Sequence, residues 1–86
     1  MFSWDIRKAI GNFERLGVPF EEAATVFGGP DGLDWEDLTH SQLELRYKQV
    51  GISVADRILL VVYTLRRAGD GKETIRIIGA RQASRK

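Results

Sequence analysis

Residues 57–64 form a nearly unbroken apolar run, RILLVVYT, which constrains the fold more than any other stretch of the chain. This run is rich in β-branched and aromatic residues and too short to span a membrane, which is typical of a strand covered on both faces in the middle of a sheet. Residues 68–71 (AGDG) have the composition of a turn, and residues 74–80 (TIRIIGA) alternate like a second strand. The pattern predicts a hairpin with Ile75 and Ile77 on one face, Arg76 and Ile78 on the other, and Arg81 just beyond the strand end.

Two helices are expected before this hairpin. A short edge strand at residues 2–4 precedes Asp5, a typical N-cap residue, and Gly17 suits the end of the first helix. Its apolar residues recur at helical spacing and should face the core: Ile6, Ile10, Phe13 and Leu16 or its neighbour Ala9. The second helix should have Pro19 in its first turn, with Glu21 and Glu22 near the start, and end at residues 28–30. Its expected buried residues are Phe20, Ala23, Ala24 and Phe27.

Further strands complete the expected sheet. Residues 31–39 contain a weak strand signal around Leu33 and Trp35, and residues 45–49 alternate as a half-exposed strand with a basic outer edge up to Gly51. Residues 53–56 should form the turn into the central strand. The order predicts an α+β fold with a short N-terminal strand, two helices, and then an antiparallel sheet of three to four strands. We expect one domain over residues 1–82 and a polar tail over residues 83–86.

The composition argues against several classes of function. The chain has no cysteine and one histidine, so neither a disulfide framework nor a zinc site is expected, and it contains no glycine-rich phosphate loop. No cofactor is expected. No apolar segment is long enough for a membrane span, and the N-terminus lacks the pattern of a signal peptide, so we expect a cytoplasmic protein with no membrane partner.

The net charge of +1 conceals a strong asymmetry along the chain. Residues 19–45 contain seven acidic residues and no Lys or Arg, whereas residues 57–86 contain eight basic and two acidic residues. The basic part is suited to binding nucleic acid. The acidic part is suited either to binding a basic partner or to neutralising the basic part within the fold. A DNA-binding domain has less support, because neither expected helix carries a basic face suited to the major groove.

The candidate chemistry lies in arginines near the strand ends. Guanidinium groups stabilise charge that develops on phosphate oxygens. A phosphodiester would therefore be bound if four arginines converge in the fold: Arg46, Arg57, Arg76 and Arg81. The alternative is that each arginine is a solvated strand residue. His40 is a candidate for the general acid or base, and it is equally a candidate for a hydrogen-bonding residue in a turn. Glu44 should share a face with Arg46, as a base or as its salt-bridge partner.

Aromatic residues add further candidates. Tyr63 either places a phenol in the site or is a half-buried structural residue. Trp4 and Trp35 suit stacking on bases, although in so small a domain at least one of them should belong to the core.

Several phrases together resemble a known family over nearly the whole chain. They are FSWD at residues 2–5 with Lys8 and Asn12, GVPFEEA at 17–23, His40-Ser41 with Glu44 and Arg46, Arg57, Tyr63, and RIIGAR at 76–81. Their order and spacing resemble the BrnT family of bacterial toxins. The resemblance implies a RelE-like fold and a metal-independent ribonuclease toxin that cleaves RNA and arrests translation. It also implies a BrnA-like ribbon-helix-helix antitoxin, through which alone the toxin would meet operator DNA.

The resemblance also implies roles for particular residues. Its polar positions give Arg46, Arg76, Arg81, His40 and Glu44 as catalytic candidates, and we assign substrate binding to Lys8, Lys48, Arg57 and Tyr63. The antitoxin should cover the basic sheet face with acidic or aromatic groups.

Three features of the chain depart from the family pattern. Leu16 stands where relatives usually carry a His, Gly79 stands where a Ser is usual, and the chain ends at Lys86 before a helical extension that is common in the family. These departures support an alternative reading, a catalytically weak or inactive relative that serves as an antitoxin-binding module.

Overall fold

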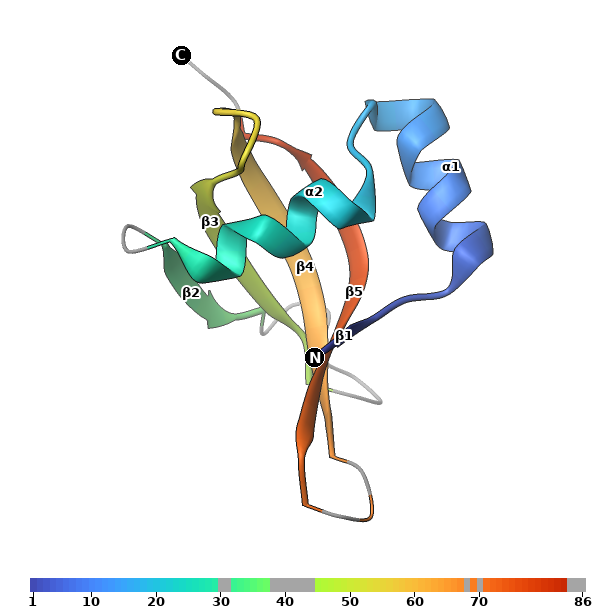
Figure 1. Ribbon diagram of the computed structural model, residues 1–86, viewed down its shortest axis with the longest axis vertical. Helices are drawn as coiled ribbons and strands as arrows, with labels where there is room; N and C mark the ends of the chain where they lie inside the picture. Colours follow the sequence, from blue (N-terminus) through green and yellow to red (C-terminus); the bar gives the residue numbers. More distant parts are fainter. Residues whose placement is uncertain (30–31, 38–44, 68, 70, 84–86) are drawn as a thin grey trace.

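Two helices and a five-stranded sheet make up the part of the chain that the structure describes. A computed structural model of the chain describes residues 1–29, 32–37, 45–67, 69 and 71–83. The sheet has the order β1-β5-β4-β3-β2, and its strands are β1 (Phe2–Ser3), β2 (Leu33–Glu36), β3 (Tyr47–Ile52), β4 (Ile58–Arg67) and β5 (Glu73–Gln82). The helices are α1 (Ile6–Leu16) and α2 (Phe20–Ala24), which continues as the 3₁₀ helix η1 (Thr25–Gly28). Figure 1 shows α2 crossing one face of the sheet while α1 stands at its side.

The predicted hairpin is the centre of the sheet. β4 is the third of the five strands and pairs antiparallel with both β5 and β3, which confirms the prediction of a central strand. The hairpin is longer than predicted, because β4 continues to Arg67 and β5 begins at Glu73. At its other end β5 runs to Gln82, so Arg81 lies within this strand and not beyond its end.

The prediction of a purely antiparallel sheet of three to four strands was wrong. β1 pairs parallel with β5, with Phe2 opposite Ile75 and Ser3 opposite Arg76. The two helices lie between β1 and the rest of the sheet in sequence, and such a long connection allows the first strand to enter the sheet parallel to the last. The weak signal near Leu33 and Trp35 does form a strand, and β3 runs through Gly51 because that residue still pairs with Leu59.

The core lies between α2 with η1 and the inner face of the sheet, the face that these helices cover. Fully or almost fully buried side chains make up this core: Val18, Phe20, Ala23, Val26, Leu59, Val61, Ile77 and Ala80. Phe20 and Ala23 confirm the buried face that was predicted for the second helix, although Pro19 is its N-cap and not part of its first turn. Trp4 packs against this core, with its ring edge-on to Phe20, while Trp35 is 46% exposed, so one tryptophan belongs to the core as expected.

The ends of α1 are as predicted, but its buried face is not. The Asp5 carboxylate accepts hydrogen bonds from the backbone N–H groups of Arg7 and Lys8, and Gly17 ends the helix in a left-handed conformation with φ 73°. The apolar stripe expected in the core is instead exposed, with fractions between 43% and 66% for Ile6, Ile10, Phe13 and Leu16. α1 turns another side to β5, on which Asn12 is buried and Ala9 packs against the core.

Candidate active site

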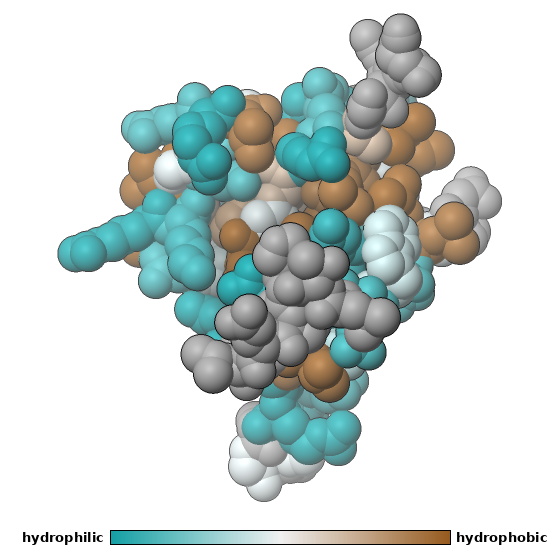
Figure 2. Space-filling view, turned by 180° about the vertical axis from the view of Figure 1, so that it is seen from behind, coloured by the Kyte–Doolittle hydropathy of each residue, from teal (hydrophilic) through white to brown (hydrophobic). Residues whose placement is uncertain are grey.

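The candidate site lies on the outer face of the sheet, the face turned away from α2. Because side chains alternate along a strand, Leu59, Val61 and Tyr63 lie under the helices while Leu60, Val62 and Thr64 point outward. Residues paired across neighbouring strands share a face, so Lys48 beside Val62 and Arg81 beside Leu60 are also on the outer face. Figure 2 shows this side, with hydrophobic side chains gathered near the end where β3 and β4 connect and hydrophilic ones around them.

A bulge in β5 brings Arg76 and Arg81 to the same face. The two arginines are five positions apart, which on a regular strand would send them to opposite faces. Tyr63 pairs with Ile77 but Val62 pairs with Gly79, so Ile78 is an extra residue in β5. The bulge shifts the alternation by one residue, and Arg81 thereby joins Arg76 on the outer face. Arg81 pairs with Leu60 and Arg76 pairs with Thr64 on β4. Leu60 and Thr64 are four residues apart along that strand, which corresponds to a distance of about 13 Å.

Arg46 and Arg76 flank Thr64. The β3–β4 register pairs Tyr47 with Tyr63, and its continuation by one residue places Arg46 beside Thr64. On the other side Thr64 pairs with Arg76, whose Nη1 donates to the Oγ of Ser3 at 3.4 Å. Since adjacent strands are about 4.8 Å apart, the two arginine backbones are separated by about 10 Å. The backbones of the two arginines therefore lie on either side of the backbone of Thr64, while the Arg76 guanidinium group reaches Ser3 on β1.

Thr64 itself was not predicted as a site residue. Its side chain is 1% exposed, and its hydroxyl oxygen is the buried side-chain polar atom that has no hydrogen-bond partner within the described part of the chain. A buried hydroxyl without a partner costs free energy, so packing alone does not explain a threonine at this position. Ser3 and Thr64 carry no distinctive local pattern, so only the strand register could have identified them.

A pocket of about 240 Å³ joins the C-terminal end of α1 to the outer face. Arg15 and Arg81 contribute its cationic groups, and its lining also includes Leu16, Leu60, Val62 and Gly79. A Cβ atom added at Gly79 would meet no heavy atom within 4 Å. Leu16 and Gly79, the two internal positions that depart from the family pattern, therefore lie on the same pocket.

Tyr63 is not brought together with the arginines, because it lies on the inner face. Its ring packs between those of Phe27 and Tyr47, at centroid distances of 4.9 and 5.6 Å, and its hydroxyl donates to the Oδ2 of Asp34 at 3.3 Å. Burial, followed by the nearby Asp34 charge, raises the pKa of Tyr63 to about 12. The phenol therefore stays protonated at neutral pH and acts there as a hydrogen-bond donor.

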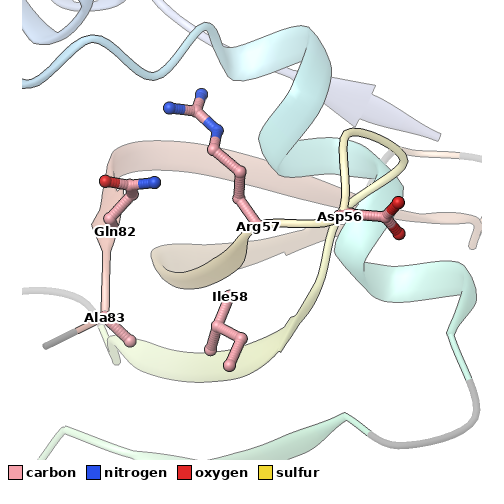
Figure 3. A pocket seen from close by; sticks show the side chains of 5 residues that line it. All are labelled: Asp56, Arg57, Ile58, Gln82 and Ala83. Carbon is pink, nitrogen blue, oxygen red and sulfur yellow. The ribbon is translucent and has the colours of Figure 1, made fainter. Parts of the chain in front are cut away.

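Arg57 is also separate from the other arginines. Its Nε donates to the Oε2 of Glu22 at 2.9 Å and its Nη2 to the carbonyl oxygen of Gly17 at 3.2 Å. The hydrogen bond from Arg57 is the main cause of a lowered Glu22 pKa, and it raises the pKa of Arg57 in turn. Figure 3 shows Arg57 in a pocket of about 450 Å³ with Ile58, Gln82 and Ala83, while the Asp56 carboxylate points away from its guanidinium group. The Arg57 charge is thus held in an ion pair that joins α2 to the start of β4.

The remaining candidates have different positions. Lys48 is on the outer face, where its Nζ lies 3.8 Å from the Oδ2 of the buried Asp37. Lys8 is exposed on α1 and does not line the pocket that contains Arg81. His40 and Glu44 lie outside the described residues. Within the described residues, no group of three or more acidic, His or Cys side chains is arranged to hold a metal ion, and no helix is long and apolar enough to cross a membrane.

The structure is that of a small α+β protein whose outer sheet face carries Lys48, Arg76 and Arg81. The chain belongs to the BrnT family, the ribonuclease toxins of type II toxin-antitoxin systems, whose family model matches residues 4–86. Its fold is similar to that of the Brucella abortus ribonuclease toxin BrnT, with a TM-score of 0.71, 18% sequence identity and coverage of 99% of each chain. No curated protein sequence matches the chain significantly.

Proposed function

We propose that this protein is a metal-independent endoribonuclease that cleaves cytoplasmic RNA on the outer face of its sheet and thereby arrests translation. Its membership in a ribonuclease toxin family supports the reaction class. The observation that supports the location is the row formed by Arg46, Thr64 and Arg76, with Arg81 on the same face. Guanidinium groups held on neighbouring strands are suited to phosphates, because rigid elements fix their geometry.

The proposed reaction uses the RNA's own nucleophile. The ribose 2′-oxygen attacks the adjacent phosphorus and loses its proton to a base, the bond from phosphorus to the 5′-oxygen breaks, and that oxygen gains a proton from an acid. The products are a 2′,3′-cyclic phosphate and a 5′-hydroxyl end. Arg46, Arg76 and Arg81 offset the charge that grows on the phosphate oxygens, and we assign the proton transfers to Glu44 and His40. Lys48 and the pocket between Arg15 and Arg81 hold neighbouring parts of the RNA.

The partner that we propose is a BrnA-like ribbon-helix-helix antitoxin, because type II systems pair a toxin with a protein antitoxin. Acidic groups of this antitoxin would cover the outer-face arginines, and the antitoxin alone would contact operator DNA.

A test of the ribonuclease is incubation of the purified protein with RNA in EDTA, alone and with ribosomes. The double variant Arg76→Ala, Arg81→Ala should lose cleavage by a factor on the order of a hundred or more, because it removes two groups that stabilise the transition state. The matched control, Arg67→Ala with Lys72→Ala, removes the same charge from the tip of the hairpin and should cleave like the wild type. Circular dichroism checks that both variants fold. Intact RNA with the wild-type protein under both conditions would refute the proposal.

A second candidate function is a catalytically weak family member that chiefly binds its antitoxin. The pocket beside Arg81 favours this alternative, because Leu16 supplies only apolar contact there and Gly79 supplies no side chain. Expression of the chain in bacteria separates the two, since a ribonuclease should stop growth and a binding module should not.

A further inference from the structure

The apolar face of α1 is left uncovered by the rest of the chain. Ile6, Ile10 and Phe13 are 66%, 53% and 54% exposed. The helix is held in this orientation by Asn12, whose side-chain amide donates to the carbonyl oxygens of Val18 and Ala80 and accepts from the N–H of Ala80. An amphipathic helix normally turns its apolar stripe inward, so an exposed stripe marks a surface for a partner.

The exposed stripe forms one wall of a groove, which we call the α1 groove. Its volume is about 580 Å³, and it lies between α1 and the start of α2. Its lining is mainly apolar, with Trp4, Ile10, Phe13 and Phe20 among the contributors. The charged residues that line it, Glu14 and Glu21, are both acidic and exposed. Figure 1 shows α1 standing to the side of the sheet, whereas α2 crosses the face of the sheet.

We infer that the α1 groove binds a segment of the cognate antitoxin that has apolar side chains flanked by Lys or Arg. The chain belongs to a family whose members have a protein antitoxin, so a protein partner is required. Aromatic side chains in a groove are typical anchors for a partner's apolar residues, and Glu14 and Glu21 are complementary to basic flanks. The inference rests on the antitoxin partnership in the proposed function but not on ribonuclease activity.

The α1 groove is separate from the outer face. Trp4 and Phe20 belong to the helix side of the molecule, whereas Arg46 and Arg76 flank Thr64 on the opposite side of the sheet. A substitution in the groove should therefore weaken antitoxin binding while RNA cleavage is retained. The groove is an anchor that holds the antitoxin, distinct from the acidic groups that we propose over the arginines.

The experiment uses the full chain and the protein encoded by the neighbouring open reading frame, both purified, with affinity measured by calorimetry. Ile10→Lys and Phe13→Lys keep good helix propensity while they replace an apolar anchor with a charge that repels basic flanks. We expect each to weaken binding at least tenfold. Val54→Lys is the matched control, because Val54 is 79% exposed in the turn between β3 and β4, outside the groove, and it should bind like the wild type. RNA cleavage is measured on the same preparations.

The outcomes are distinct. The inference is supported if the groove variants lose antitoxin binding and cleave RNA at the wild-type level. If the groove variants lose antitoxin binding and the wild type itself does not cleave RNA, the inference is still supported and the ribonuclease proposal is refuted. Folded variants that bind the antitoxin as tightly as the wild type does overturn the inference. The inference is also overturned if the wild type forms a dimer that Ile10→Lys dissociates while the affinity for the antitoxin stays unchanged. If the variants do not fold, hydrogen exchange on the wild-type complex decides, and unchanged exchange over residues 6–21 overturns the inference. A neighbouring protein that does not bind the wild type refutes the partnership as well.

Discussion

Asn12 decides which side of α1 faces the sheet. Its amide donates to the carbonyl oxygens of Val18 at 3.0 Å and Ala80 at 2.8 Å, and its Oδ1 accepts from the N–H of Ala80 at 3.2 Å. The bulge at Ile78 ends just before Ala80, so the side chain satisfies backbone groups at the point where the strand is irregular. A buried amide with three hydrogen bonds can hold a helix in an orientation that its apolar stripe alone would not predict.

Glu22 is the residue through which α2 is tied to β4. It accepts hydrogen bonds from Arg57 and from the hydroxyl of Ser53, and its pKa is lowered chiefly by the Arg57 bond. We expect Glu22→Gln to reduce the free energy of unfolding at pH 7 by about 1–3 kcal/mol, because hydrogen bonds to a charged group are lost in a largely buried site. Urea unfolding monitored by circular dichroism measures the change. Glu21→Gln removes the same charge from the same helical turn and should change stability by less than about 0.5 kcal/mol.

The same pair predicts a dependence on pH. The folded-state pKa of Glu22 is below its ordinary value of 4.5, so the stabilisation is complete above that value and is lost as the pH falls through the folded-state pKa. The difference between the wild type and Glu22→Gln should therefore shrink on acidification below about pH 4.5. A difference that stays constant down to pH 2.5 would show that the carboxylate charge is not what stabilises the contact.

Among the elements, β3 and η1 approach each other closely at Gly51, which has no side chain. A Cβ atom at Gly51 would lie 2.7 Å from the Cγ1 of Val26, which is fully buried. We expect Gly51→Ala to lower stability by about 1–3 kcal/mol, because the added methyl group forces η1 away from the strand. Gly79→Ala is the control on β5, where an added Cβ meets nothing, and it should be neutral or slightly stabilising. Equal midpoints of thermal unfolding for the two variants would contradict this account of the contact.

The hairpin of β4 and β5 shows how one bulge determines which side chains share a face of the sheet. Residues 57–64 and 74–80 carried a strong strand signal, and the faces of Ile75, Ile77 and Arg76 were predicted correctly. The extra residue at Ile78 has no local sequence signal, because a bulge depends on the pairing between two strands and not on either strand alone. The common face of Arg76 and Arg81 was therefore not predictable from their spacing.

At the scale of the whole molecule, the outer face concentrates cations that are distant in sequence. Arg46 and Lys48 come from the start of β3 and the residue before it, and Arg76 and Arg81 come from β5. If the four contact phosphates of a single-stranded RNA, the logarithm of the binding constant should fall with the logarithm of salt concentration with a slope of about −3. RNA methylated at every 2′-oxygen lacks the nucleophile and allows binding to be measured without cleavage.

The double variant Arg76→Ala, Arg81→Ala should reduce this slope by about 1.4, because two phosphate contacts are lost. The variant Arg67→Ala with Lys72→Ala should leave the slope close to that of the wild type. A slope that is the same in all three proteins would place the RNA on another surface.

The sequence by itself determined the α+β class, the central hairpin, the caps of α1 and the buried face of α2. These features depend on local propensity, alternation and capping residues, which neighbouring positions encode directly. The phrases spread along the chain also determined the family, which the family model confirmed over residues 4–86. Only the tertiary structure decided that β1 joins the sheet parallel to β5, that α1 exposes its apolar stripe, and that Arg57 and Tyr63 lie apart from the outer-face arginines. These features arise from contacts between residues far apart in the chain, such as Asn12 with Ala80, and the local sequence on either side of such a contact does not encode it.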